Sequence, residues 1–354
     1  MAEAESAQTA APSKGISNWL KFGMALAISL LFAWLFVRGL DLDEVADSLR
    51  SANYVYVAPA LALFAVSVAF RAARWRYFLL PGNDLTWRQL LPSVLIGYAG
   101  NNLLPLRAGE LVRAQHLIDH YGVPRMRTFG ALLMERLFDS AVLATFVLWG
   151  LVITGAGDAY LGLGLLLAAA SGGAFIVCTV FSRHPGLPER ISQWNLPLLT
   201  PRIRQEIAGL GGSFLAGFTV LTSWSRFAMA TLTSVGAWAF ELAMYLLIAQ
   251  AFSLDASVLR IAFAGAAANV AMSLPSAQGG VGPFQYFATQ ALTRAGVAGP
   301  TAAAFALALH FFLVAPVSLI GLVVLWRSTI PGARKHPVAG EPVPGPTTEG
   351  TPAN

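Results

Sequence analysis

The chain has 354 residues, enough by length alone for two soluble domains. Hydrophobic residues make up 56% and charged residues only 12%, about half the usual soluble share, and the mean hydropathy is +0.62. So little charge cannot coat a soluble globule, and a single cysteine excludes a disulfide scaffold or a cysteine-rich metal cluster. We therefore expect an all-α, polytopic membrane protein.

The formal net charge is +5, and nearly all the basic residues are arginines that stand singly between apolar runs. This spacing argues against a nucleic-acid partner and fits the rule that basic residues collect on the inner side of a membrane.

Three regions are expected along the chain. Residues 1–16 form a polar, disordered tail without the basic start of a signal peptide. Residues 17–336 form a single membrane domain, and residues 337–354 hold five of the 20 prolines and form a disordered tail.

Six apolar runs have about the 20 residues that a helix needs to cross a bilayer. They are residues 19–37, 54–70, 128–155, 160–181, 226–252 and 300–326. Two shorter apolar stretches, 90–104 and 261–274, each lead through a proline into a Gly-bearing turn. These stretches predict the first arms of two re-entrant helical hairpins, 90–121 and 261–297.

The basic residues test this count of six spans and two hairpins. It puts every basic cluster on the inner side and the acidic 41–47 loop outside. Counting either or both hairpins as full crossings places a basic cluster outside. We therefore expect both termini in the cytoplasm and the chain in a bacterial inner membrane. Apolar residues at helical spacing within 200–222 predict an amphipathic helix on the inner surface.

The two predicted hairpins resemble each other. Each has an apolar arm with an asparagine (Asn102 or Asn269), then Pro-x-x-x-Gly, then a helical stretch. Their predicted entry from opposite faces makes them inverted repeats, and broken helices in corresponding positions indicate a transport site near the midplane. Each tip offers backbone N–H groups that suit an anion. The alternative is that proline and glycine only kink two ordinary helices.

Four motifs occur in order along the chain. They are Arg71-Ala-Ala-Arg-Trp-Arg76, Asn101-Asn-Leu-Leu-Pro-Leu-Arg-Ala-Gly-Glu-Leu-Val-Arg113, Glu135-Arg-Leu-Phe-Asp139 and Leu274-Pro-Ser-Ala-Gln-Gly-Gly-Val-Gly-Pro-Phe-Gln285. In these motifs the chain, over about 19–326, resembles the membrane part of the lysylphosphatidylglycerol synthases, a family often called flippase-like. The resemblance implies a lipid translocator. The synthases add a soluble aminoacyl-transferase domain where this chain has only its proline-rich tail, so aminoacylation is not implied.

Ionisable residues inside spans are costly and usually paired or functional. Glu135 and Asp139 share one helix face with Arg136 beside it. Arg136 suits a lipid phosphate, and the two carboxylates suit a basic headgroup or a proton. The alternative is an ion pair with Arg107 or Arg113 that ties the first hairpin to this helix.

The predicted substrate-binding set combines this helix with both hairpin tips. It consists of Asn102, Arg107, Glu110, Arg113, Glu135, Arg136, Asp139, Gln278, Gly279, Gly280, Gly282 and Gln285. Glu241 is either a proton carrier or paired with a residue on another helix. His310 is interpreted as an interhelical hydrogen-bond partner, and Arg71, Arg74 and Arg76 mostly as anchors at the end of the second span.

Two weaker patterns concern metals. Asp41-Leu-Asp43 is typical of the acidic loops of membrane glycosyltransferases, yet Asp41 also fits the N-cap of a short helix. His116 and His120 have zinc-ligand spacing without an obvious third ligand. We expect no cofactor, and the chain lacks the phosphate loop that binds ATP.

The sequence favours ATP-independent translocation of a phosphate-bearing lipid, of the anionic phospholipid or polyprenyl-phosphate type. Two alternatives stay open. One is a membrane glycosyltransferase or lipid-modifying enzyme that uses Asp41 and Asp43. The other is a non-catalytic membrane partner of a lipid-biosynthetic enzyme.

Overall fold

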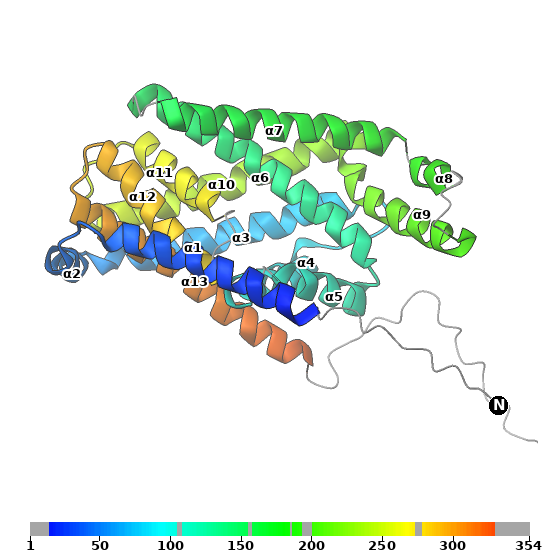
Figure 1. Cartoon of the computed structure of the whole chain (residues 1–354), viewed down its shortest axis with the longest axis horizontal. Coiled ribbons are helices and arrows are strands. Elements are labelled where there is room, and N and C mark those ends of the chain that lie inside the picture. Colours follow the sequence, from blue (N-terminus) through cyan, green and yellow to red (C-terminus); the bar gives the residue numbers. More distant parts are fainter. Residues whose placement is uncertain are drawn as a thin grey trace, which may run out of the picture.

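The computed structural model describes residues 14–104, 108–154, 158–184, 186–192, 200–272 and 278–329, and in these the regular structure is entirely helical. The prediction of an all-α fold is confirmed. The helices are α1 (Lys14–Val37), α2 (Leu42–Ser51), α3 (Val57–Leu79), α4 (Trp87–Leu103), α5 (Gly109–Tyr121), α6 (Arg125–Thr154), α7 (Asp158–Arg183), α8 (Leu187–Ser192), α9 (Pro201–Leu215), α10 (Trp224–Ala251), α11 (Val258–Ala271), α12 (Pro283–Arg294) and α13 (Gly299–Thr329), with 3-10 turns η1 (Tyr54–Tyr56), η3 (Ala216–Thr222) and η4 (Gln278–Gly280). The long helices lie side by side along one axis (Figure 1).

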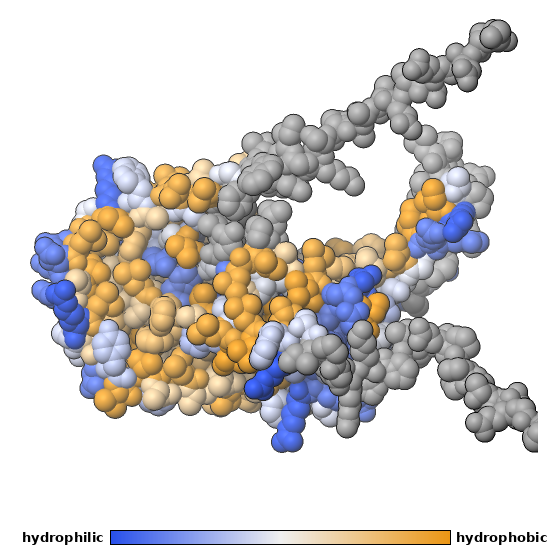
Figure 2. Space-filling view, turned by 90° about the horizontal axis from the view of Figure 1, so that it is seen from below, coloured by the Kyte–Doolittle hydropathy of each residue, from blue (hydrophilic) through white to orange (hydrophobic). Residues whose placement is uncertain are grey.

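Four of these helices have the length and composition of membrane spans. Within the described residues they are Tyr54–Leu79, Gly164–Arg183, Trp224–Ala251 and Gly299–Thr329. Figure 2 shows apolar side chains over most of one flank, with hydrophilic residues gathered towards the two ends. This pattern suits a protein in a bilayer, while the count of six full spans stays a prediction.

Two pairs of packed helices, α4–α5 and α11–α12, lie where the sequence predicts the two hairpins, while their re-entrance stays a prediction. They lie towards opposite ends of the long axis (Figure 1). The long helix α6 follows the first hairpin and packs against α11, while α13 follows the second hairpin and packs against α4. The units α3–α6 and α10–α13 therefore repeat one order, a long helix, a hairpin and a long helix, in opposite senses.

Glycines allow the first hairpin to pack tightly. A Cβ added to Gly100 of α4 would lie 2.4 Å from the Cα of Gly109 in α5. On the other side of α4, a Cβ on Gly321 of α13 would lie 2.3 Å from the carbonyl oxygen of Leu95. Helices in membranes associate through such small residues because lipid provides no hydrophobic force between them.

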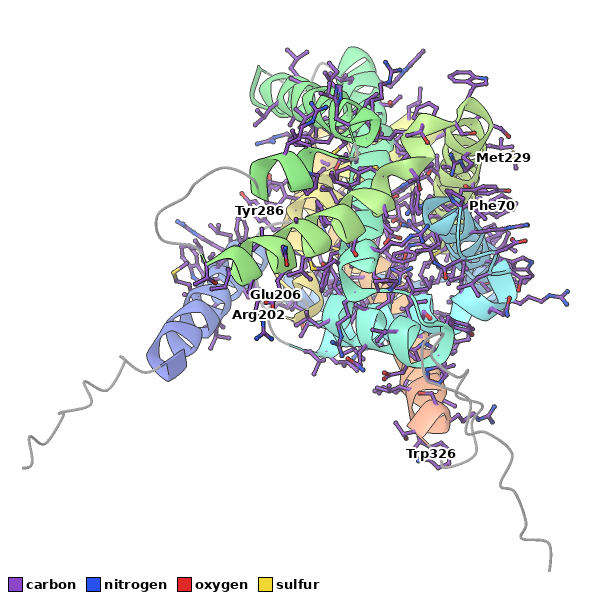
Figure 3. All side chains as sticks on the ribbon, turned by 90° about the vertical axis from the view of Figure 1, so that its right-hand side faces the viewer. Phe70, Arg202, Glu206, Met229, Tyr286 and Trp326 are labelled. Atoms are coloured by element: carbon purple, nitrogen blue, oxygen red, sulfur yellow. The ribbon has the colours of Figure 1, made fainter. Side chains whose placement is uncertain are left out.

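The helix predicted at 200–222 is present as α9 and η3. Thr200 caps its start, since its hydroxyl accepts a hydrogen bond from the amide of Ile203. Arg202 and Glu206 form an ion pair one turn apart on its exposed face (Figure 3). Phe218 is buried against the bundle, whereas Ile203, Ile207 and Leu210 are exposed. The placement of this segment on the inner membrane surface stays a prediction.

The helices α3 and α10 pack along each other in the middle of the bundle. A Cβ on Gly236 would lie 2.6 Å from the ring of Phe70, so α10 needs a glycine where α3 presents an aromatic ring. Phe70 also packs on Phe240, with ring centroids 5.3 Å apart. This packing places the polar residues of the two helices opposite each other.

Candidate functional site

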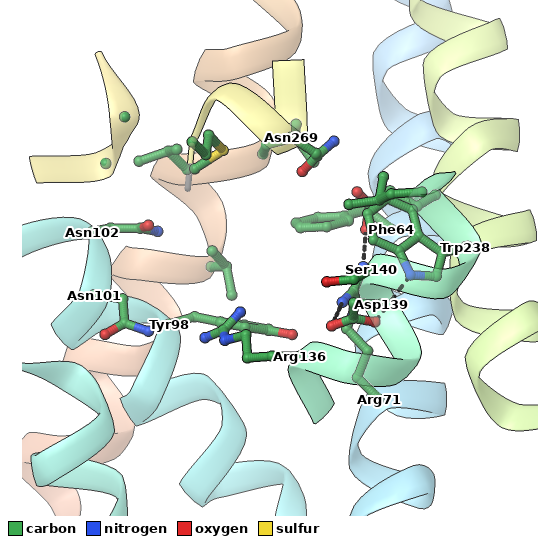
Figure 4. A pocket seen from close by; sticks show the side chains of 18 residues that line it. Phe64, Arg71, Tyr98, Asn101, Asn102, Arg136, Asp139, Ser140, Trp238 and Asn269 are labelled. Atoms are coloured by element: carbon green, nitrogen blue, oxygen red, sulfur yellow. Dashed lines mark hydrogen bonds and ion pairs between the residues drawn. The ribbon is translucent and has the colours of Figure 1, made fainter. Parts of the chain in front are cut away.

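The tips of the two hairpins meet beside a cavity of about 220 Å³ (Figure 4). A Cβ on Gly279 would lie 3.6 Å from the carbonyl oxygen of Asn102, so the tips are in contact. The cavity is lined by Phe64, Arg71, Tyr98, Asn101, Asn102, Arg136, Asp139, Ser140, Leu143, Trp238, Glu241, Asn269, Met272, Gly279, Gly280, Leu313, Val314 and Val317. Both halves of the repeat thus contribute to one site.

A buried ion cluster lies behind the cavity. Arg74 of α3 has no exposed surface. Its guanidinium donates to Asp139 at 2.7 Å and to Glu135 at 3.0 Å, both on α6, and to Ser234 of α10 at 3.1 Å. Arg74 therefore joins three helices and forms ion pairs with two carboxylates, while its Nε atom has no hydrogen-bond partner among the described residues.

Arg113 extends the cluster to the first hairpin. Its Nη1 atom lies 3.1 Å from Oε2 of Glu135, and its guanidinium lies 3.5 Å from the ring centroid of Trp75. This is the ion pair expected as the alternative role of Arg113, and it ties α5 to α6. Because Arg113 is buried and does not line the cavity, a lipid phosphate in the cavity would not touch it.

Arg71 brings a second cation to the cavity wall. Its Nη2 atom donates to Glu241 at 2.6 Å and its Nη1 atom lies 3.6 Å from Asp139. The guanidinium also lies 4.9 Å from the ring centroid of Trp238. Glu241 therefore has the partner on another helix that was one of its two expected roles.

The interpretation of Arg71 and Arg74 as membrane anchors is wrong, because both are buried in ion pairs. Arg76 alone fits it, since its side chain is 44% exposed and pairs with Asp84 at the surface. Arg71 and Arg74 lie three residues apart on one face of α3, opposite carboxylates in two later helices. Their position on one helix face is visible in the sequence, but their partners on α6 and α10 are not.

Arg136 is the most accessible cation of the site. Its only ion pair among the described residues joins it to Glu110 at 2.8 Å, and its side chain is 44% exposed. Tyr98 and Asn101 line the cavity near it (Figure 4). The hydroxyl of Tyr98 and the Oδ1 atom of Asn101 are buried and lack a hydrogen-bond partner among the described residues. Buried polar atoms normally have partners, so these two suit a polar ligand.

The second hairpin tip is held in place from α13. Gly279, Gly280 and Gly282 have positive φ angles of 69°, 74° and 94°, which favour glycine. His310 Nε2 lies 2.8 Å from the carbonyl oxygen of Gly279, and its Nδ1 lies 2.6 Å from Nε2 of Gln285. The interhelical role predicted for His310 is confirmed. The same helix, α13, also holds the first tip, because the amide of Asn102 donates a hydrogen bond to the hydroxyl of Ser318 at 3.0 Å.

The structure divides the predicted substrate-binding set into layers. The cavity wall holds Asn102, Arg136, Asp139, Gly279 and Gly280, and the proton-carrier candidate Glu241 also lies there. Glu110, Arg113 and Glu135 do not line the cavity and form ion pairs behind or beside it. Gln285 accepts from the amide of Gly282 at 2.8 Å within the tip. Arg107 and the side chain of Gln278 lie outside the described part.

Further residues of the cavity wall were not predicted from the sequence as part of the site. They include Arg71, Tyr98, Asn101, Trp238 and Asn269. Asn269 was noted only as a feature of the repeat. The aromatic residues resemble any apolar core residue in a span, so the sequence carried no signal for them.

The two metal patterns have structural roles here. The carboxylate of Asp41 accepts from the amides of Asp43 and Glu44 and so caps α2. The rings of His116 and His120 stack with centroids 4.1 Å apart, and His116 bonds Ser93. Among the described residues, no three His, Cys, Asp or Glu side chains form a group that could hold a metal ion.

Comparison with known proteins identifies the family. The model of the lysylphosphatidylglycerol synthase TM region matches residues 23–321, and the chain belongs to this family. It is similar to Glycosyltransferase AglD of Haloferax volcanii, with 27% identity over 331 residues, covering 84% of this chain and 52% of AglD. This chain thus matches about half the length of AglD.

Two further relatives are UPF0104 membrane proteins. One, from Methanothermobacter thermautotrophicus, is 27% identical over 284 residues, which cover 74% of this chain and 82% of the relative. The other, from Methanocaldococcus jannaschii, is 28% identical over 141 residues, covering 38% and 42%. No solved structure matches the chain.

Proposed function

We propose that the protein moves a phosphate-bearing lipid between the leaflets of a bacterial inner membrane, without ATP. The headgroup would occupy the cavity between the hairpin tips. The observation that carries the proposal is the meeting of two oppositely directed hairpins at a cavity with two arginines in its wall. Inverted broken helices of this kind form the substrate sites of many transporters.

The polar wall of the cavity suits a phosphate group. Arg71 and Arg136 present planar guanidinium groups, which bind phosphate oxygens through paired hydrogen bonds. The hydroxyl of Tyr98 needs a partner and can donate to the same oxygens. These three groups come from α3, α4 and α6, so a headgroup would bridge three helices.

The size of the cavity supports binding of a headgroup rather than a whole lipid. Its volume of about 220 Å³ lies below the roughly 300–1,000 Å³ of pockets that enclose a drug-sized ligand. Leu143, Val314 and Val317 form an apolar part of the wall. The acyl or prenyl chains would stay in the bilayer beside the hairpins while the headgroup crosses.

Purified protein in liposomes tests this proposal. With fluorescent acyl-chain-labelled phospholipids and an impermeant quencher, translocation shows as quenching beyond the outer half of the label. We expect Arg136→Gln to lower the rate at least tenfold, because a charge-assisted phosphate contact contributes about 1.5–3 kcal/mol.

Arg76→Gln is the matched control. Arg76 has the same 44% exposure as Arg136 and pairs with Asp84 at 3.0 Å, but it does not line the cavity. If Arg136→Gln transports lipid at the wild-type rate, as Arg76→Gln is expected to do, the proposed site is contradicted. No quenching beyond half by wild type, with any lipid class, would contradict translocation itself.

A membrane glycosyltransferase is the second candidate, supported by the similarity to AglD. It assigns Asp41 and Asp43 to a metal-dependent reaction. Asp41→Asn/Asp43→Asn tests it. This candidate predicts that the variant loses a metal-dependent sugar transfer that wild type performs, whereas the translocator predicts that the variant still moves lipid in the same liposomes. The role of a non-catalytic partner for a lipid-biosynthetic enzyme would show as co-purification of that enzyme with an inactive translocator.

A further inference from the structure

Arg71 is shared between the cavity and two carboxylates. It lines the cavity wall, and it pairs with Glu241 at 2.6 Å and with Asp139 at 3.6 Å. An anionic headgroup would compete with these carboxylates for the guanidinium. The consequence for the protein depends on which carboxylate loses its cation.

The other carboxylates of the cluster keep a partner in that event. Asp139 retains Arg74 at 2.7 Å and the indole N–H of Trp238 at 3.0 Å. Glu135 is paired with Arg74 and Arg113, neither of which lines the cavity.

Glu110 differs from these buried groups because its side chain is 31% exposed and water can solvate it. It therefore tolerates the loss of Arg136.

Glu241 depends on Arg71 alone. Its side chain is 5% exposed, and Arg71 is its only cationic partner among the described residues. The hydroxyl of Tyr245 donates to it at 2.5 Å, but this partner is neutral. A buried carboxylate without a compensating cation is costly, and such a group becomes neutral by taking up a proton.

Among the described residues, the other groups around Glu241 are neutral, anionic or cations already paired elsewhere, and Arg136 of the same cavity wall pairs with Glu110. From α6, Asp139 faces it across Arg71, and α11 presents the amide of Asn269. On α3, Arg74 is bound to Asp139, Glu135 and Ser234. His310 of α13 is bound within the second hairpin, and η1 and η3 contain no Asp, Glu, Lys, Arg or His.

We propose that Glu241 binds a proton when a singly charged anionic headgroup binds Arg71, so that lipid and proton cross the membrane together. The inference rests on the proposed function, and it names the coupling ion of the same site. A hydrogen-bonded chain runs from Glu241 through Tyr245 to Asn269 of α11, at 2.5 Å and 3.0 Å. The state of Glu241 is thereby linked to the first arm of the second hairpin.

A pH difference across liposomes tests the coupling. One proton with each single negative charge makes transport electroneutral, so a difference of one pH unit supports about a tenfold asymmetry of the lipid at equilibrium. We expect acyl-chain-labelled phosphatidylglycerol to collect in the leaflet facing the more alkaline side, with the potential clamped by potassium and valinomycin. Reversing the pH difference should reverse the asymmetry. Equilibration to equal halves under either gradient would overturn the coupling and leave translocation standing.

Two variants assign the proton. Glu241→Gln keeps the size of the side chain and removes the proton site. With this variant the lipid should therefore distribute equally between the leaflets under either pH difference. Asp84→Asn, which removes an exposed surface carboxylate, should respond as wild type does. A Glu241→Gln protein that still concentrates lipid with the gradient would overturn the role of Glu241.

A binding measurement covers the case in which Glu241→Gln moves no lipid. In weakly buffered detergent with a pH dye, lysophosphatidylglycerol should cause uptake of about one proton per bound lipid by wild type at pH 7. Glu241→Gln should take up none. Binding is measured in parallel with radiolabelled lysophosphatidylglycerol. Binding without proton uptake, or no binding, overturns the inference, whereas uptake without transport overturns translocation only.

Discussion

Glu135 pairs with two buried arginines, Arg74 and Arg113. Its two carboxylate oxygens lie 3.0 Å from Arg74 and 3.1 Å from Arg113, and all three side chains are at most 3% exposed. The two arginines come from α3 and from the first hairpin, so one side chain of α6 holds both. A buried ion pair contributes little by itself, but removing one partner leaves uncompensated charge behind.

We therefore expect Glu135→Gln to destabilise the protein by about 3–5 kcal/mol. Thermal unfolding in detergent measures this change. Asp84→Asn is the comparison, because Asp84 pairs with Arg76 at the surface and exposed pairs contribute only about 0–1 kcal/mol. Equal melting temperatures for the two variants would show that the buried cluster is not a stabilising unit.

At the scale of helices, backbone contact fixes the first hairpin. Gly100 and Gly109 meet where α4 and α5 cross, and Gly109 has no room for a side chain, since its Cβ would lie 2.2 Å from the carbonyl oxygen of Gly97. The obstructing atoms are backbone, so they cannot turn aside. The tip that carries Asn101 and Asn102 is positioned by this crossing.

Gly100→Ala should therefore cost about 1–3 kcal/mol, the usual cost of overpacking, and should lower transport by displacing the tip. Gly172→Ala in α7 is the control, because nothing lies within 4 Å of its Cβ position. That change should be neutral or stabilising by up to about 1 kcal/mol. Unfolding midpoints and quenching rates of both variants decide the matter, and a Gly100→Ala protein as stable as Gly172→Ala would refute tight packing.

The sequence predicted the positions of helices and hairpins better than it predicted which residues pair between helices. The hairpins were visible because an apolar arm too short to span ends at a proline and glycines, as at Asn102 and Asn269. The burial of Arg71 and Arg74 was not visible, because their partners lie 61 to 170 residues further along the chain. The same holds for the link from His310 to Gly279, since local periodicity carries no information on which helices pack together.

For the whole molecule, the orientation in the membrane remains a prediction that labelling can test. Ser51 of α2 and Thr329 of α13 are exposed, and α2 packs beside the start of α13, whose other end carries Thr329. In a Cys178→Ser background, Ser51→Cys should react with an impermeant maleimide added to intact spheroplasts. Thr329→Cys should react only after the membrane is opened. The reverse pattern would place both termini outside.

The separation of the ion-pair partners along the chain also constrains how the protein is made. Arg71 enters the membrane with α3, but Glu241 follows it by 170 residues. At a synthesis rate of about 5–20 residues per second, this delay is roughly 10–30 s. The delay between Asn102 and its partner Ser318 is longer, because Ser318 follows by 216 residues. The first unit of the repeat therefore lacks the partner residues Glu241 and Ser318 until the second unit has been synthesised.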